Sequence, residues 1–163
     1  MEHRLDPRKA APEAMKTMSN LHAYVANCGL EHGLLELVKL RASQMNGCAW
    51  CMDMHTKELR FAGETEQRIY LLSAWRECPF YSDRERAALA WTEELTSLER
   101  SEVSDEVYRL ARGQFSEEEL VKLTIAIVAI NGANCINIGF RAVPGSYQPG
   151  IRGKTAPAHE RES

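Results

Sequence analysis

Residues 34–55 read LLELVKLRASQMNGCAWCMDMH, and the pattern of this stretch is helical. Leu34, Leu37 and Val38 recur at the spacing of one helix face. The Asn46-Gly47 pair is typical of a helix end, and a second helical pattern begins directly after it. The stretch therefore predicts two consecutive helices joined by a very short turn.

Helix punctuation continues on both sides of this stretch. Ser82 with Glu85, and Ser116 with Glu119, form capping boxes that typically begin helices. We expect helices over residues 12–28, 31–45, 48–63, 66–76, 82–98, 104–112 and 116–140. Because strand signals are nearly absent, the sequence predicts an all-α fold.

The length and composition of the chain are those of one globular domain. It has 163 residues, of which 44% are hydrophobic and 26% are charged. A Pro144-Gly145 pair follows the last predicted helix. We expect a single helical domain over residues 1–148 and a tail over residues 149–163, either flexible or embracing a neighbouring subunit.

The charge balance and the apolar runs exclude several classes of partner. Lys and Arg number 20 against 23 Asp and Glu, a net charge of −3 that argues against nucleic-acid binding. The longest apolar run, residues 123–130, falls short of the roughly 20 residues that span a bilayer. Residues 1–20 are charged and contain two prolines, unlike a signal peptide. We expect a cytoplasmic protein without a nucleic-acid or membrane partner.

The five cysteines need a chemical explanation rather than a structural one. Cytoplasmic thiols are kept reduced, and an odd count does not suit a disulfide framework. Cys28, Cys78 and Cys135 are isolated in sequence, and we expect each of them to be a small core side chain. The remaining two are a close pair and a candidate for chemistry.

That pair, Cys48 and Cys51, shares a helix face with His55. Gly47 places Cys48 at or near the helix N-cap, where free N–H groups and the helix dipole favour an anion. Lowering a thiol pKa from about 8.5 to about 6.5 requires about 2.7 kcal/mol of stabilisation of the thiolate. A helix terminus contributes about 0.3–1 kcal/mol, and at most about 2 kcal/mol. A second contributor is needed, and His55 is available as imidazolium or as base.

Two other interpretations of the trio stay open at this point. Cysteine and histidine are zinc ligands, although structural zinc sites have four ligands and no second Cys-x2-Cys or His-x3-His is present. Alternatively, both thiols and the imidazole are buried core groups without chemistry. We expect neither a metal nor a bound cofactor.

Glu36, Cys48, Cys51 and His55 together form the pattern E-x11-C-x2-C-x3-H. With its flanks, this pattern resembles the alkylhydroperoxidase (AhpD-like) branch of the carboxymuconolactone decarboxylase family. The resemblance implies a thiol peroxidase in which Cys51 reacts with a peroxide substrate and Cys48 resolves the product. It also implies a proton relay through Glu36 and His55, and an external dithiol reductant: a small dithiol, a lipoyl group or a thioredoxin-like protein.

Trp50 departs from the family pattern, because the best-studied members have a second histidine immediately before the second cysteine. An indole N–H can donate a hydrogen bond but cannot act as a base. If the two helices form a tight hairpin, Glu36 should reach His55 or a water molecule more readily than either sulfur.

The family resemblance also implies a homotrimer or a homohexamer. Residues 116–140 are apolar on more than one face, so part of this helix should meet a partner chain. Two alternatives to the peroxidase remain: a lactone decarboxylase acting on cyclic acids, and a non-enzymatic thiol redox sensor.

Overall fold

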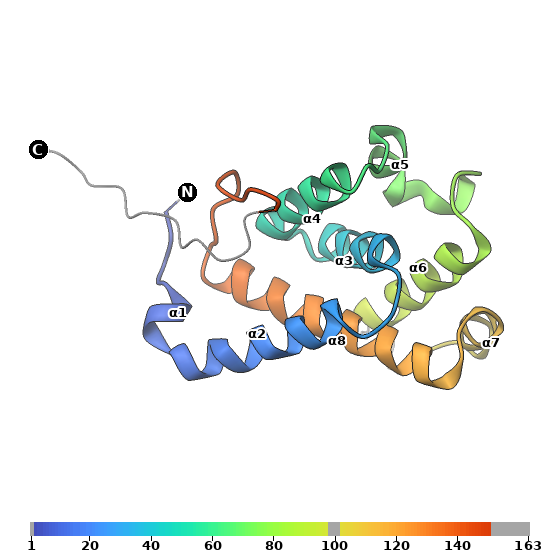
Figure 1. The fold of residues 1–163 in the computed structure, drawn as a ribbon, viewed down its shortest axis with the longest axis horizontal. Coiled ribbons are helices and arrows are strands. Elements are labelled where there is room, and N and C mark those ends of the chain that lie inside the picture. Colours follow the sequence, from blue (N-terminus) through green and yellow to red (C-terminus); the bar gives the residue numbers. More distant parts are fainter. Residues whose placement is uncertain (1, 98–101, 151–163) are drawn as a thin grey trace, which may run out of the picture.

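The computed structural model describes residues 2–97 and 102–150, and that part of the chain contains helices and no strand (Figure 1). The prediction of an all-α fold is confirmed. The elements are α1 (Pro7–Ala10), α2 (Pro12–Ala26), α3 (His32–Asn46), α4 (Ala49–Phe61), α5 (Glu66–Tyr70), the 3-10 helix η1 (Leu72–Glu77), α6 (Asp83–Thr96), α7 (Asp105–Gln114) and α8 (Glu117–Gly139).

Helix α3 lies at the centre, in contact with α4, α6 and α8, and α2 runs along α8 (Figure 1). Its apolar residues are buried on several sides, as a helix surrounded by three others requires. They are Leu34, Leu35, Leu37, Val38 and Leu40. The core consists of one large cluster between α2, α3, α6, α7 and α8 and a second between α3, α4, α5, η1 and α6.

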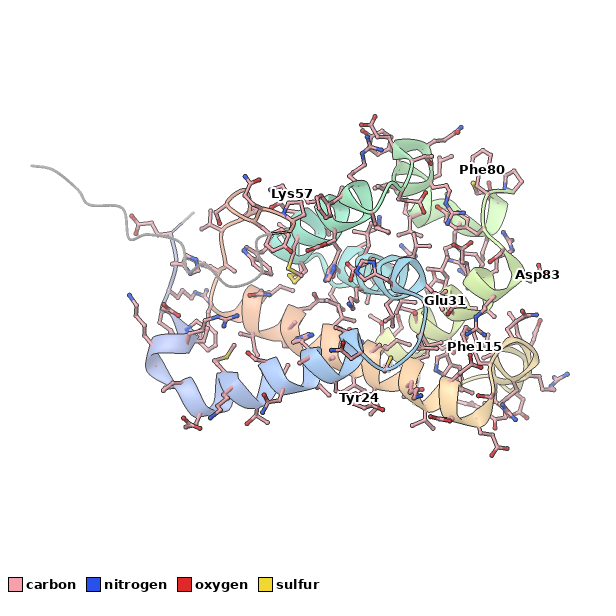
Figure 2. The ribbon with its side chains drawn as sticks, viewed as in Figure 1. Tyr24, Glu31, Lys57, Phe80, Asp83 and Phe115 are labelled. Atoms are coloured by element: carbon pink, nitrogen blue, oxygen red, sulfur yellow. A yellow bond between two sulfur atoms is a disulfide. The ribbon has the colours of Figure 1, made fainter. Side chains whose placement is uncertain are left out.

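Arg84 of α6 ties three helices together at one end of the molecule. Its guanidinium pairs with Glu31, which precedes α3, at 2.8 Å and with Glu119 of α8 at 2.7 Å. It also lies 4.1 Å from the ring centroid of Phe115, in the region where Figure 2 labels Glu31 and Phe115. This arrangement holds the N-terminal ends of α3 and α8 next to α6.

Three predicted helix boundaries are corrected. Helix α2 ends at Ala26 instead of residue 28, because Asn27 turns its side-chain amide back onto the Ala23 carbonyl at 2.7 Å. The predicted helix at 66–76 divides into α5 and η1, whose buried residues Ile69, Leu72 and Trp75 follow the three-residue spacing of a 3-10 helix. Helix α1, between two prolines, was not predicted.

Helix α8 continues without a break through Asn131-Gly132. By length and composition alone it could cross a membrane, a property that the apolar run of residues 123–130 did not reveal. It packs against α2, α3 and α6, and its asparagines hydrogen-bond to other helices, as in the core helix of a soluble domain. Some of its apolar side chains nevertheless remain exposed: Val121, Val128 and Ile138.

The isolated cysteines follow the prediction at two of three positions. Cys28 and Cys78 are buried among apolar side chains. Cys135 is exposed, so its expected core position is wrong in this chain. It follows the buried Asn134 on α8 and therefore lies on a different side of the helix.

The segment after α8 returns to α4. Asp53 accepts from the Gly145 N–H at 3.0 Å, and Lys57 donates to the carbonyls of Gly145 and Tyr147. Helix α6 ends at Thr96, two residues before the end predicted for the helix at 82–98. The tail predicted at 149–163 lies largely outside the described residues. The division into a domain and a tail stays a prediction.

Candidate active site

The turn between α3 and α4 positions the cysteine pair. Gly47 adopts a left-handed conformation, with φ of 69°, that ends α3. The Cys48 N–H then bonds to the Ser43 carbonyl at 3.0 Å, and α4 begins at the next residue. Cys48 is therefore the N-cap and Cys51 lies in the first turn, as the sequence predicted. The structure pairs the two as a disulfide with a Cα–Cα distance of 5.4 Å.

The two sulfurs have different surroundings although each cysteine is only 1% exposed. Both cysteines pack in a small cluster with Ala42 and Ile130. Cys51 lines a cavity, and its Sγ accepts a hydrogen bond from the side-chain amide of Asn137 at 3.3 Å. Of the two cysteines, Cys51 is therefore the one next to the cavity.

Glu36 and His55 form a buried pair beside the disulfide. Oε2 of Glu36 lies 2.7 Å from Nδ1 of His55, and Oε1 lies 2.8 Å from Nζ of Lys39. The expectation that Glu36 reaches His55 is confirmed. Burial alone would raise the pKa of the Glu36 carboxyl, but hydrogen bonds and charges from His55 and Lys39 outweigh it and hold that pKa at about 2.

This pairing determines which nitrogen of the His55 ring carries the proton when the ring is neutral. The Glu36 carboxylate can only accept, so Nδ1 of His55 carries the proton between them. Nε2 is buried and has no hydrogen-bond partner among the described residues. In the neutral ring, Nε2 is an acceptor, ready to take a proton from a group that enters the site.

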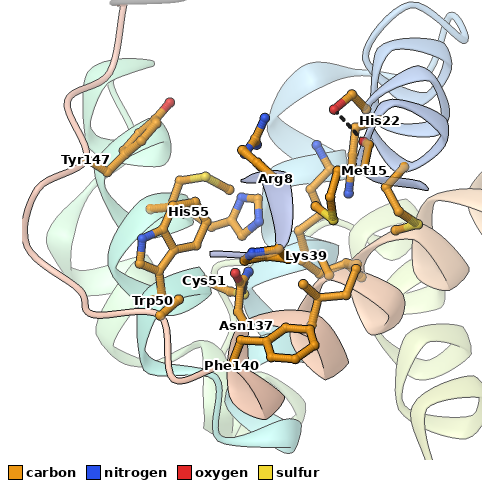
Figure 3. A pocket seen from close by; sticks show the side chains of 18 of the residues that line it. Arg8, Met15, His22, Lys39, Trp50, Cys51, His55, Asn137, Phe140 and Tyr147 are labelled. Carbon is orange, nitrogen blue, oxygen red and sulfur yellow. Dashed lines mark hydrogen bonds between the residues drawn. The ribbon is translucent and has the colours of Figure 1, made fainter. Parts of the chain in front are cut away.

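A cavity of about 770 Å³ joins these groups. Figure 3 shows Cys51 and Asn137 close together, with Trp50 and Tyr147 on one side and His22 on the other. Glu36, Cys51 and His55 all line it. The rest of the wall combines polar side chains with an apolar part, which is formed by Met15, Met18, Met54, Ile130, Ile136 and Phe140. This volume is in the usual range for small-molecule sites.

Sequence reasoning missed several polar groups of this cavity, among them Lys39, Asn137 and His22. Lys39 could have been found, because it follows Glu36 by three residues on the same helix face. Asn137 ends a row of asparagines on α8, but no local pattern connects it with Cys51, 86 residues away. His22 comes from α2 without any sequence signal. Its burial, together with Lys39 and His55, lowers the pKa of His22.

The structure also bears on the zinc interpretation. Over residues 2–97 and 102–150, no group of three or more His, Cys, Asp or Glu side chains is arranged to hold a metal ion. Instead, Nδ1 of His55 is bound to Glu36, and the two cysteines are bound to each other. Glu36, Cys48, Cys51 and His55 are thus brought together as neighbours.

A model of the carboxymuconolactone decarboxylase family matches residues 12–94, just over half of the 163-residue chain. The chain belongs to the carboxymuconolactone decarboxylase family. The matched region runs from α2 into α6 and contains Glu36, both paired cysteines and His55. This family member is 46% identical over 138 residues to the uncharacterised protein YdfG of Bacillus subtilis, covering 85% of this chain and 94% of YdfG.

Solved structures support the assignment. A protein of unknown function from Agrobacterium tumefaciens, described as an AhpD antioxidant defence protein, is 46% identical with a TM-score of 0.86, covering 90% of this chain and all of that one. The debrominase Bmp8, solved with 2,3,4-tribromopyrrole, is 15% identical to this chain, and the two structures superpose with a TM-score of 0.77. The match covers 85% of this chain and 74% of Bmp8, and at this identity it shows a common fold alone. The resemblance to the AhpD-like branch is confirmed.

Proposed function

We propose that this family member is a thiol-dependent peroxidase that reduces organic hydroperoxides with Cys51 and Cys48. One observation carries the proposal: of the two paired cysteines, Cys51 is among the residues that line a ligand-sized cavity and Cys48 is not, and the two lie within disulfide reach. A redox pair with one member in the wall of a cavity suits a peroxide. Decarboxylation of a lactone would leave the pair unused.

The first half of the cycle begins from the reduced pair. The Cys51 thiolate attacks one oxygen of the hydroperoxide, so that an S–O bond forms and the O–O bond breaks. The leaving alkoxide takes a proton and departs as the alcohol. Cys51 is then a sulfenic acid, oxidised by two electrons, and the peroxide has been reduced by the same two electrons.

The second half restores the pair. The Cys48 thiol, losing its proton, attacks Sγ of Cys51, an S–S bond forms, and the sulfenic oxygen leaves as water. An external dithiol then reduces this disulfide with two electrons and two protons and is itself oxidised to a disulfide. The disulfide in the structure corresponds to the state that awaits this reductant.

Glu36 and His55 are proposed to handle the protons. The Glu36 carboxylate holds Nδ1–H of His55, which leaves the buried Nε2 as an acceptor beside the cavity. The imidazole can take the proton of the Cys51 thiol and return it to the alkoxide. Because Trp50 cannot act as a base, this relay depends on His55.

The test is to count free thiols in the reduced protein before and after one equivalent of cumene hydroperoxide. We expect two thiols to be lost, and mass spectrometry should find two hydrogens missing from the peptide that contains Cys48 and Cys51. Cys48→Ser should still consume one equivalent and stop at the sulfenic acid, whereas Cys51→Ser should not react.

Cys135→Ser is the matched control, because it removes an exposed thiol outside the site and should leave the count of lost thiols unchanged. Oxidation of Cys28 or Cys135 while Cys48 and Cys51 stay free would contradict the proposal. Oxidation of the pair without continued turnover in the presence of dithiothreitol would favour a redox sensor instead.

A further inference from the structure

A row of asparagines on α8 faces the hairpin of α3 and α4. Asn131 bonds to Asn46 at 2.6 Å and to Thr96 at 3.2 Å, and Asn134 accepts from Ser43 at 3.1 Å. Asn137, three residues further, donates to Cys51 Sγ at 3.3 Å. Two members of the row join helix to helix, whereas the third touches the redox pair itself.

The contact of Asn137 is chemically specific. Of the side-chain polar groups in the described part of the chain, Asn137 supplies the one hydrogen bond to either sulfur of the pair. Its side chain has a donor, Nδ2, and an acceptor, Oδ1, and only the donor interacts favourably with a thiolate. A thiolate carries a full negative charge and is a stronger acceptor than a disulfide sulfur, so the same N–H gains strength when the pair is reduced.

The charged groups around the cavity do not replace this donor. The acidic ones already have partners: Asp6 accepts from the Arg8 N–H, Glu36 from His55 and Lys39, and Glu58 from Tyr147. The ammonium group of Lys39 is thereby committed to Glu36. The other basic groups, His3, Arg8 and His22, line the cavity without a hydrogen bond to Cys51.

We propose that Asn137 is a catalytic residue that holds Cys51 as the thiolate once the disulfide has been reduced. The inference rests on the proposed function only in taking Cys51 as the reacting sulfur. The amide stabilises the reduced, anionic form of the pair more than the disulfide, so it makes Cys51 more reactive at neutral pH and the disulfide easier to reduce.

The experiment measures the pKa of Cys51 from the pH dependence of its alkylation by iodoacetamide, followed by mass spectrometry of its own peptide. It is done on the full chain in the Cys48→Ser background. Asn137→Leu removes the donor at similar size, and we expect the pKa to rise by about one unit, a tenfold loss of thiolate. Asn137→Asp places an anion beside the sulfur and should raise the pKa at least as far.

Two further variants separate this effect from a general change in structure. Asn131→Asp adds the same charge on the same helix, about 9 Å along its axis from position 137, and should leave the pKa of Cys51 unchanged. Asn137→Gln keeps the amide donor, so the pKa of Cys51 should rise less in this variant than in Asn137→Leu. Asn137 is half-buried, so an isosteric aspartate should fold, and melting curves verify this.

A second readout is the reduction potential of the pair in the chain with Cys48 present, measured in dithiol redox buffers. If the reduced form loses a factor of ten in stability, the potential becomes about 30 mV more negative in Asn137→Leu. The proposal would be overturned if Asn137→Leu or Asn137→Asp folds and its Cys51 is alkylated with the same pH dependence as in the Cys48→Ser protein that keeps Asn137. Neither readout uses peroxide, so the shift can be found even if the protein reduces no hydroperoxide.

Discussion

At the scale of single residues, Glu36 is the group on which the site's charge balance depends. It is 4% exposed, and its two carboxylate oxygens bind His55 and Lys39 separately. A buried carboxylate between two such partners contributes to folding as long as it is ionised. Its loss should therefore be visible both in stability and in the reactivity of Cys51.

Acid should destabilise the protein through Glu36. The pKa of this carboxyl is about 2 in the folded chain, against an ordinary value of 4.5, so its stabilisation is complete above about pH 4.5 and is lost as the pH falls towards 2. The difference corresponds to about 3 kcal/mol. Urea unfolding at several pH values gives the free energy of unfolding as a function of pH. Across this window it should change less for Glu36→Gln than for the unsubstituted protein. A curve with the same slope for both proteins would contradict the role of Glu36.

His55→Ala should raise the apparent pKa of the Cys51 thiol by about one unit or more, a loss of over about 1.4 kcal/mol of thiolate stabilisation. The physical reason is that the helix N-terminus alone contributes too little. The alkylation rate of Cys51 against pH measures this change. His32→Ala, an exposed histidine at the start of α3, is the control and should leave the profile unchanged.

At the scale of elements, the α3–α4 hairpin depends on the left-handed turn at Gly47. A side chain at this position strains the backbone even though no atom would clash with its Cβ. We expect Gly47→Ala to lower the free energy of unfolding by about 1–2 kcal/mol, as measured by urea titration.

Gly33→Ala is a matched control for this substitution. Gly33 lies in the first turn of α3, has no positive φ, and its added Cβ would meet nothing within 4 Å. Alanine has a higher helix propensity than glycine, so Gly33→Ala should leave stability unchanged or raise it slightly. Equal losses in both variants would show that the left-handed turn is not the cause.

At the scale of the whole molecule, the exposed apolar side of α8 predicts a homo-oligomer. Val121 and Val128 are seven residues apart on one side of the helix and are 62% and 54% exposed in the single chain. Surfaces of this kind are usually covered by another chain. We expect light scattering at micromolar concentration to give three or six times 18.4 kDa.

Val128→Glu tests which surface is involved, since a charge placed in an apolar interface should dissociate the assembly. Leu110→Glu, at an exposed apolar position on α7, is the control and should leave the mass unchanged. A mass near 18.4 kDa for the unmodified protein would refute the oligomer.

Local chemistry accounts for the features that were predictable from the chain alone. Helix caps, glycine turns and apolar spacing act over a few residues, so the all-α fold, the position of Cys48 and Cys51 at the start of α4, and the approach of Glu36 to His55 could be predicted. Long-range packing accounts for the rest. Asn137 reaches Cys51 across 86 residues, and His22 enters the cavity from a separate helix. Such contacts depend on how α2 and α8 dock against α3, which no short sequence pattern encodes.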